Sequence, residues 1–553
     1  MLRPAHLLRS DRFATHITDH PVTLAVVLSI IWIVLGLIGH DPWKPDEAHT
    51  FGVVYRLLKG GDWVVPLLAG EPYLDKPPLI YLTAALTSSV FSPILALHDG
   101  ARLASGLYIA VTMLFVAMTA KELYGTNKSW VAALMLLGCG GLLLRGHQLI
   151  PDTAFLAGTA MGLYSLAVSA RRPLIGGIWL GTGLGICFLS EGFVEPVMLL
   201  ITMVLLPVVS PHWRTRQYLL TLAIAIIAAM PWAIIWPMLL EARSPRLFTE
   251  WFWVKNVERL KGIFVFTPDE NYIYYLNVLP WLAWPAWPFA LWSLWTEGRA
   301  GLQKPGIILP FTAFVSFFVF LSILGEGRDT FGMPLLLPLS LLAAASFETL
   351  RRGAANLYYW FAIILFTFFA IVGWFYWTAI DLGIPSRLWK HMMEMQPAYQ
   401  AGEGPFSVAL AAIFTIAWLV LLFNVKRRPE RPVIIWAGGI TLMWALVTLL
   451  LVRYIDTGKT YRAVFSQLSQ ALPAGHGCIY SRSLGEPQRA MLDYFGNILT
   501  VRLEKKGKRP DCDLLIIQDK WQFPSHVEAP WQLVWEGRRP GDKLERFRLY
   551  RQP

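Results

Sequence analysis

Long apolar stretches alternate with short polar connections along most of the chain. About thirteen of these stretches approach the length of roughly 20 apolar residues that an α-helix needs to cross a bilayer. Beyond Arg453, short apolar runs alternate with turn-rich polar stretches, a pattern typical of a small α/β domain. We therefore predict an all-α polytopic membrane domain over residues 1–455 and a small α/β domain over residues 456–553. The predicted spans are centred near Ile30, Ala110, Met135, Gly162, Gly183, Met203, Ala225, Trp284, Phe314, Leu339, Leu365, Ile413 and Gly439.

Basic residues gather in every second connection between the apolar stretches. Because cytoplasmic loops of membrane proteins are enriched in Lys and Arg, the N-terminus is predicted to be cytoplasmic. An odd number of spans then places residues 456–553 outside, so we expect a multi-pass protein of the bacterial inner membrane with a periplasmic C-terminal domain. The first apolar stretch has no small-residue cleavage site and is predicted to remain as a span. The basic residues are Arg3, Arg9, Arg12, Lys121, Lys128, Arg171, Arg172, Arg214, Arg216, Arg299, Lys304, Arg351, Arg352, Lys426, Arg427, Arg428 and Arg431.

The composition agrees with a membrane protein, since 55% of the residues are hydrophobic and only 15% are charged. The net charge of +11 does not indicate a nucleic-acid partner, because the basic residues are spread over short loops and form no patch. Cys139 and Cys187 fall inside apolar stretches, where cysteine behaves as a small buried hydrophobe. A periplasmic tail would permit a disulfide between Cys478 and Cys512, but sequence alone does not fix the distance between them.

The polar segment Asp41–Pro78 follows the first span and carries the strongest candidate chemistry. Asp46 and Glu47 follow Pro45 at the start of a helical pattern, where backbone N–H groups favour ionised carboxylates. They are the candidate catalytic residues, because an ionisable group beside a bilayer is costly and usually functional. The alternative is a plain helix cap.

Further candidates for substrate binding lie in other outer segments. Tyr73, Asp75 and Lys76 precede two prolines that fix the chain locally, although a turn with an internal ion pair is an alternative. The short turn of residues 145–152 holds Arg145 and Asp152. The alternative is that Arg145 snorkels to the lipid headgroups and Asp152 caps the next helix. Two more arginines complete the set: Arg259, in a predicted interfacial helix, and Arg328, in the turn GEGRDT, where Arg can hold a phosphate bidentately.

The chain has no P-loop, no dinucleotide fingerprint, no HExxH and no serine nucleophile elbow. A nucleotide donor is therefore not expected, and a membrane-embedded activated lipid is the expected energy source. No cofactor is certain. The carboxylates of Asp46, Asp75 and Asp152 are candidates for holding a divalent metal ion.

The segment PDEAHTFGVVYRLLKGGDWVVPLLAGEPYLDKPPLIYLTAAL closely resembles the first outer loop of bacterial GT-C glycosyltransferases. The nearest members are the 4-amino-4-deoxy-L-arabinose lipid A transferases and their protein O-mannosyltransferase-like kin. The segments LIPDTAF, NVERLKG and RRPGDKLERFRLYR are also similar. The resemblance implies a GT-C fold of about thirteen transmembrane helices, with interfacial helices in the outer loops.

The resemblance also implies an activity and roles for individual residues. The enzyme would take a sugar from a polyprenyl phosphate and pass it to a lipid A phosphate or another envelope lipid or glycan at the periplasmic face. Asp46 would be the catalytic carboxylate, with Tyr73, Asp75 and Lys76 lining the donor pocket. Alternatives are a protein O-glycosyltransferase of the same family, a transporter or flippase of lipid-linked sugars, and a degenerate scaffold.

Three segments depart from the pattern of that family. The chain has Glu191–Gly192 where the family usually carries Lys-Gly, FTPDENYIYY lacks a usual His, and GEGRDTFGMP lacks a usual Lys and Tyr. Arg328 is the candidate to replace part of the missing positive charge. The departures favour a relative with a different sugar or acceptor.

Overall fold

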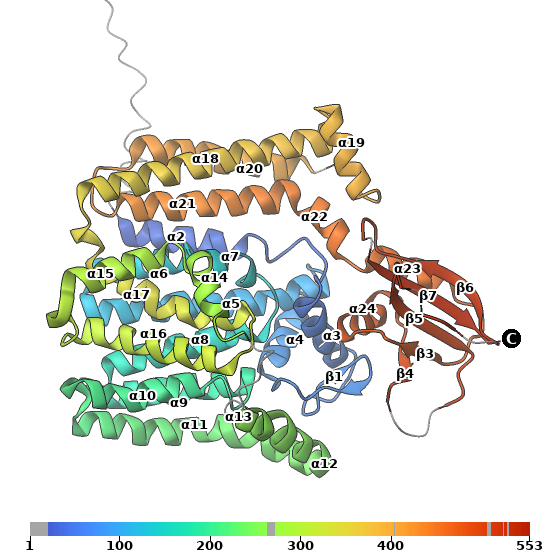
Figure 1. The fold of residues 1–553 in the computed structure, drawn as a ribbon, viewed down its shortest axis with the longest axis horizontal. Coiled ribbons are helices and arrows are strands. Elements are labelled where there is room, and N and C mark those ends of the chain that lie inside the picture. Colours follow the sequence, from blue (N-terminus) through green and yellow to red (C-terminus); the bar gives the residue numbers. More distant parts are fainter. Residues whose placement is uncertain are drawn as a thin grey trace, which may run out of the picture.

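The computed structural model describes residues 20–552 except 263–270, 403, 506–509, 524, 528–529 and 543. Arg3, Arg9 and Arg12, and the first part of FTPDENYIYY, lie outside the described residues. The described chain folds into a bundle of roughly parallel helices, with a small sheet at one end of the bundle (Figure 1).

Most of the helices belong to the bundle. Eight described helical segments are long and apolar enough to cross a membrane. They are Leu97–Tyr124 (α5), Pro173–Glu191 (α9), Arg216–Arg243 (α11), Pro305–Leu324 (α16), Thr330–Thr349 (containing α17, Leu336–Ser346), Arg352–Leu382 (α18), Pro405–Asn424 (α20) and Arg431–Lys459 (α21, Arg431–Leu446, with α22, Val452–Lys459). Shorter helices in the bundle are Pro21–Val34 (α2), Thr126–Leu137 (α6), Gly140–Arg145 (α7), Pro151–Val168 (α8), Val197–Val209 (α10), Tyr274–Leu282 (α14) and Ala286–Gly301 (α15).

Of the predicted span centres, all but one lie inside a helix of the structure. The exception is Trp284, which falls between α14 and α15. Proline causes this break: Pro285 directly precedes α15, and a proline cannot donate the backbone hydrogen bond that would continue α14. The predicted division after residue 455 falls inside α22, so that division stays a proposal.

The segments predicted for the outer face lie together at the sheet end of the bundle (Figure 1). They include Asp46–Leu58 (α3), Leu67–Leu68 (β1), Glu71–Pro72 (β2) and Leu79–Phe91 (α4) from the first loop. The later loops contribute Pro245–Thr249 (α12), the π-helical turn Glu250–Glu258, Arg259–Gly262 (α13) and Ser386–Met395 (α19). The long loops, with their short helices and strands, thus lie at one end of the bundle.

The small sheet has five strands in the order β4-β3-β5-β7-β6. Their bounds are Ile479–Arg482 (β3), Thr500–Arg502 (β4), Leu514–Lys520 (β5), Gln532–Gly537 (β6) and Glu545–Arg551 (β7). β3 pairs in parallel with β4 and β5, and the pairs β5–β7 and β7–β6 are antiparallel. With Arg462–Ala471 (α23) and Glu486–Gly496 (α24), the sheet confirms the predicted small C-terminal α/β fold.

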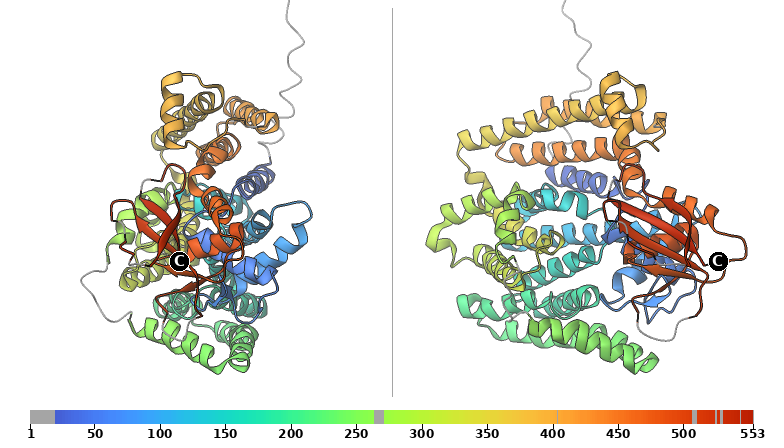
Figure 2. Two further views of the ribbon diagram at one scale, coloured as in Figure 1. Left: turned by 90° about the vertical axis from the view of Figure 1, so that its right-hand side faces the viewer. Right: turned by 45° about the vertical axis from the view of Figure 1, so that its right-hand side comes forward.

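The helix α3 lies between the bundle and the sheet, as the rotated views also show (Figure 2). Phe51 and Val54 are fully buried on α3, which explains its apolar periodicity. Gly52 lets α24 approach closely, because a Cβ at this position would lie 2.3 Å from the Cβ of Ala490. The buried Asp493 of α24 pairs with Arg56 of α3. The C-terminal sheet is thus connected through α24 to the helix that carries Asp46.

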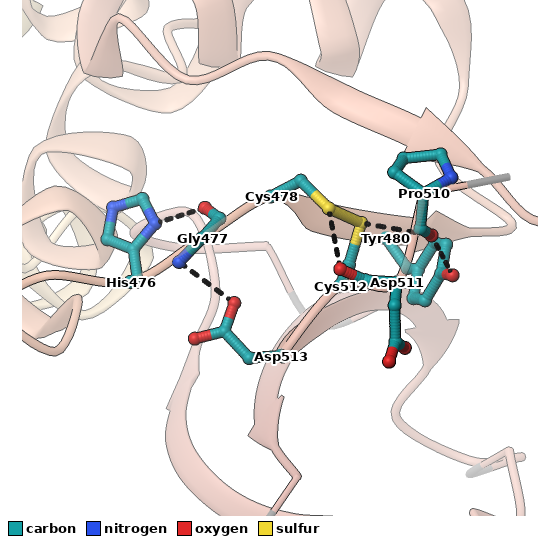
Figure 3. The surroundings of a disulfide bond; sticks show 8 residues. All are labelled: His476, Gly477, Cys478, Tyr480, Pro510, Asp511, Cys512 and Asp513. Atoms are coloured by element: carbon teal, nitrogen blue, oxygen red, sulfur yellow. Dashed lines mark hydrogen bonds between the residues drawn. A yellow bond between two sulfur atoms is a disulfide. The ribbon is translucent and has the colours of Figure 1, made fainter.

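A disulfide joins Cys478, just before β3, to Cys512, just before β5 (Figure 3). The two cysteines are 34 residues apart in sequence. The link therefore closes a loop that contains α24 and ties together two neighbouring parallel strands.

Replacing both cysteines by serine is expected to destabilise the C-terminal sheet by about 2–4 kcal/mol, because the unfolded chain regains the freedom that the closed loop removes. The measurement is the unfolding temperature of the purified protein with and without reductant. The variant should lie below the oxidised parent and should not respond to reductant. Equal unfolding temperatures for parent and variant would contradict the prediction.

Candidate active site

A cavity of about 430 Å³ opens between the bundle, the first outer loop and α24. It draws together most of the residues that the sequence singled out, although they are far apart along the chain. Its polar lining consists of Asp46, His49, Thr50, Tyr73, Asp75, Lys76, Tyr81, Asp152, Lys255, Arg259, Glu326, Arg328, Thr330 and Glu486.

Asp46 occupies the first turn of α3 and faces the cavity. Its Oδ2 atom accepts a hydrogen bond from Nη1 of Arg145, at 3.2 Å. The same guanidinium donates to both carboxylate oxygens of Asp329, each at 3.1 Å. Arg145 thus lies beside the cavity and fixes the orientation of Asp46. The side chain of Asp46 stays 42% exposed, so a substrate can reach it.

Glu47 does not face the cavity, although it directly follows Asp46. Its side chain is 1% exposed and pairs with the equally buried Arg102, at 2.6 Å between Oε1 and Nε. The other oxygen accepts from the backbone N–H of Trp43. This placement does not support the catalytic role predicted for Glu47. Consecutive residues point about 100° apart on a helix, so only one acid of the pair can face the cavity.

Glu47→Gln is expected to destabilise the protein by about 3–5 kcal/mol, because it leaves the buried charge of Arg102 with one carboxylate fewer. The measurement is the thermal unfolding of the detergent-solubilised protein. Glu122→Gln is the matched control: Glu122 pairs with the exposed Arg171, so its loss should cost about 0–1 kcal/mol. Equal unfolding temperatures for the two variants would contradict the role assigned to Glu47.

Lys76 joins the cavity to a buried acidic pair. Its ammonium contacts Glu191, at the end of α9, and lies 3.6 Å from Glu195. Burial alone would lower the pKa of Lys76, but the two carboxylates outweigh it and hold the pKa above its usual value. Arg259 contacts the same Glu195, at 2.8 Å, and Glu326, at 2.9 Å. The acids keep both cations charged at the edge of the cavity.

Tyr73 and Asp75 also line the cavity. The ring of Tyr73 packs edge-on against His49, with ring centroids 4.7 Å apart. Burial raises the pKa of Tyr73, so this phenol stays protonated and available as a hydrogen-bond donor. Asp75 pairs with Lys255 of the π-helical turn, a further cation of the cavity lining.

Arg328 and Asp152 complete the predicted set. Both line the cavity. The guanidinium of Arg328 lies over the ring of Phe331, 5.6 Å from its centroid. Within the described residues, Arg328 has no carboxylate within ion-pair distance, unlike the other cations of the lining. It is therefore the cation most available to an anionic ligand.

Several residues of this site were not predicted from the sequence, among them His49, Glu195 and Glu486. His49 lies three residues after Asp46 on the same helical face, a spacing that could have revealed it. Glu195 lies four residues after Glu191 at the end of a span, which is a comparable signal. Glu486 belongs to α24 and reaches the cavity only because the C-terminal sheet docks on α3, so no local pattern indicates it.

The candidate metal ligands do not form a metal site. Among the described residues, no group of three or more His, Cys, Asp and Glu side chains has a geometry that could hold a metal ion. Asp46 and Asp75 face Arg145 and Lys255, which compensate their charges.

Known proteins match this chain over most of its length. A family model described as dolichyl-phosphate-mannose-protein mannosyltransferase matches residues 75–236. An undecaprenyl phosphate-alpha-4-amino-4-deoxy-L-arabinose arabinosyl transferase of Pseudomonas aeruginosa is 28% identical over 438 residues, which is 77% of this chain and 75% of the relative. Another of that name, from Serratia proteamaculans, is 24% identical over 522 residues and covers 92% of this chain and 87% of the relative.

The fold is likewise shared with a solved structure. The crystal structure of ArnT from Cupriavidus metallidurans bound to undecaprenyl phosphate superimposes with a TM-score of 0.67 and 16% sequence identity, and covers 96% of this chain and 98% of that one. These comparisons confirm the predicted class: the chain has the GT-C fold and is similar to proteins named as glycosyltransferases. Within that class, the resemblance to the aminoarabinose transferases is confirmed as well.

Proposed function

We propose that this protein transfers a sugar from a polyprenyl-phosphate donor to an envelope lipid or glycan at the periplasmic face of the inner membrane. One observation carries the proposal: a single cavity joins the exposed carboxylate of Asp46 to the cations Lys76, Arg259 and Arg328. The arabinosyl transferases similar to this chain carry undecaprenyl phosphate in their names, which supports a donor of this chemical class.

In the proposed reaction, an oxygen of the acceptor attacks the anomeric carbon of the donor sugar. The bond from that carbon to the phosphate oxygen breaks, and its electron pair stays on the departing phosphate. Lys76 and Arg328 stabilise the negative charge that develops on the departing phosphate. Fixed cations accelerate a reaction when they lie beside the atoms on which negative charge develops in the transition state. Asp46, held by Arg145, orients the acceptor oxygen beside the anomeric carbon.

The departure at Glu191 has a physical consequence for this reaction. A lysine at this position would add a second cation near the donor phosphate, whereas Glu191 pairs with the ammonium of Lys76. The site therefore holds the donor phosphate with fewer net positive charges. We propose that Arg328, which has no carboxylate within ion-pair distance among the described residues, supplies the missing charge.

The experiment is mass spectrometry of lipid A and total envelope glycans from three strains: one lacking the gene, one restored with the parent and one restored with Asp46→Asn. A pentose or hexose increment should be present only in the strain restored with the parent. Identical glycans in all three strains would overturn the proposal.

A further inference from the structure

Carboxylates outnumber cations in the lining of the cavity. The acids are Asp46, Asp75, Asp152, Glu326 and Glu486, against the bases Lys76, Lys255, Arg259 and Arg328. Behind this lining, Glu191 and Glu195 add two buried acids, and Arg145 adds one base. The cavity is thus poor in positive charge for an enzyme that has to hold a phosphate.

Nearly all of the positive charge is already compensated. Lys76 faces Glu191, Lys255 faces Asp75, and Arg259 faces both Glu195 and Glu326. Arg145 is shared by Asp46 and Asp329. Among the described lining residues, only Arg328 has no carboxylate within ion-pair distance. One uncompensated cation suits the single negative charge of the donor phosphodiester. A phosphate acceptor would bring further negative charge next to Asp46 and Glu486, which disfavours its binding.

We propose that the acceptor group is a neutral hydroxyl of an envelope glycan or lipid, that Nε2 of His49 takes up its proton, and that Glu486 of α24 stabilises the resulting imidazolium. This inference rests on the proposed function and narrows it, because it replaces a phosphate by a hydroxyl as the group that is glycosylated. It also makes α24 of the C-terminal α/β fold part of the active site.

His49 is placed for this role by the helix that carries Asp46. The two residues are three positions apart on α3, so their side chains share the face that lines the cavity. The Nε2 atom of His49 is buried and makes no hydrogen bond within the described structure. A buried nitrogen that makes no hydrogen bond and lies beside a catalytic carboxylate is poised to receive a hydroxyl group.

The carboxylate of Glu486 lies close enough to His49 to influence the pKa of the imidazole. Its Oε2 atom lies 3.4 Å from Nε2 of His49. Burial lowers the pKa of His49 below its usual value, while the carboxylates of Glu486, Asp75 and Asp46 oppose this shift. The imidazole is therefore neutral at pH 7 and able to accept a proton, and three acids stabilise the cation that forms.

The chemical step balances without any further reactant. The hydroxyl oxygen forms a bond to the anomeric carbon, and its proton moves to Nε2 of His49. The bond between the anomeric carbon and the phosphate oxygen breaks, and the electron pair leaves with the polyprenyl phosphate. The imidazolium then returns its proton to water or to the released phosphate. A phosphate acceptor would need no such base, because it is already ionised at neutral pH.

The first test identifies the linkage in the product made by the purified parent protein. The assay contains a polyprenyl-phosphate sugar in nanodiscs and a detergent extract of the envelope as the acceptor source. Mass spectrometry before and after mild acid treatment separates the two cases, because a sugar on a phosphate is released by mild acid and a glycoside of a hydroxyl is retained. Retention of the sugar is expected. Release of the sugar would overturn the inference while leaving the proposed function standing.

The second test compares His49→Gln and Glu486→Gln with the parent over a range of pH. His49→Gln should lower kcat by about 10²–10⁴-fold and abolish the acid limb of the pH profile, since that limb reports protonation of the general base. Glu486→Gln removes a carboxylate that raises the pKa of His49, so its acid limb should move to lower pH, with a lower kcat. A merely structural role of Glu486 would leave the limb in place.

Glu71→Gln is the matched control. Glu71 pairs with Arg489 of α24 across the same interface between the first loop and the C-terminal sheet, but it does not line the cavity. This variant should keep the pH profile of the parent. An unchanged acid limb in both His49→Gln and Glu486→Gln would overturn the inference. Complete inactivity of the parent protein in this assay would instead count against the proposed function.

Discussion

Asp46→Asn is expected to lower the rate of sugar transfer by about 10²–10⁴-fold, the usual contribution of a positioned acid–base or orienting group. The amide keeps the size of the carboxylate but loses its negative charge, and with it the ion pair to Arg145. The acceptor oxygen then loses the group that orients it toward the anomeric carbon. The measurement is kcat with purified protein and a polyprenyl-phosphate sugar.

Two features make the Asp46 variant informative. Its carboxylate is 42% exposed, so the substitution should change the unfolding temperature little, in contrast to Glu47→Gln. The two neighbouring acids thus form an internal comparison, in which the loss of Asp46 reduces activity and the loss of Glu47 reduces stability. An Asp46→Asn protein that keeps the activity of the parent would contradict the role assigned to this residue.

Lys76→Gln is expected to reduce kcat by about 10²–10³-fold, because it removes a cation that stabilises the departing phosphate. The single variant also leaves the buried acids Glu191 and Glu195 with less positive charge, so we expect part of its effect to be a loss of folded protein. The double variant Lys76→Gln/Glu191→Gln separates these effects, since it removes one charge of each sign.

The double variant should unfold near the temperature of the parent and remain as inactive as the single variant. Both quantities can be measured on the same purified samples. Recovery of activity in the double variant would show that Lys76 matters only by neutralising Glu191, and would contradict its role at the leaving phosphate.

The bundle could be predicted from hydropathy, because a membrane span has to satisfy its own backbone hydrogen bonds and therefore appears as a long apolar run. The motif around Asp46 likewise located the cavity, since the first loop supplies its central helix. Trp284 was misplaced as the centre of a span because a hydropathy window does not register the break that Pro285 imposes. The pattern therefore predicts where helices lie better than where they end.

The composition of the site could be predicted only in part. Asp46, Tyr73, Asp75 and Lys76 lie within one local motif, and the structure places all of them at the cavity. The orientation of Glu47 depends on Arg102, which is distant in sequence, so the adjacent acid pair suggested two cavity-facing carboxylates where the structure has one. Charge patterns within a loop do not reveal such tertiary partners.

The most direct test of the central claim follows the fate of the lipid donor. Purified protein in nanodiscs is incubated with an undecaprenyl-phosphate sugar and envelope extract, and free undecaprenyl phosphate is quantified together with the sugar bound to acceptor. The proposed transferase should release one undecaprenyl phosphate for each sugar transferred, and Asp46→Asn should release almost none. A donor that remains intact in the presence of folded parent protein would contradict glycosyl transfer and would favour transport of the lipid-linked sugar.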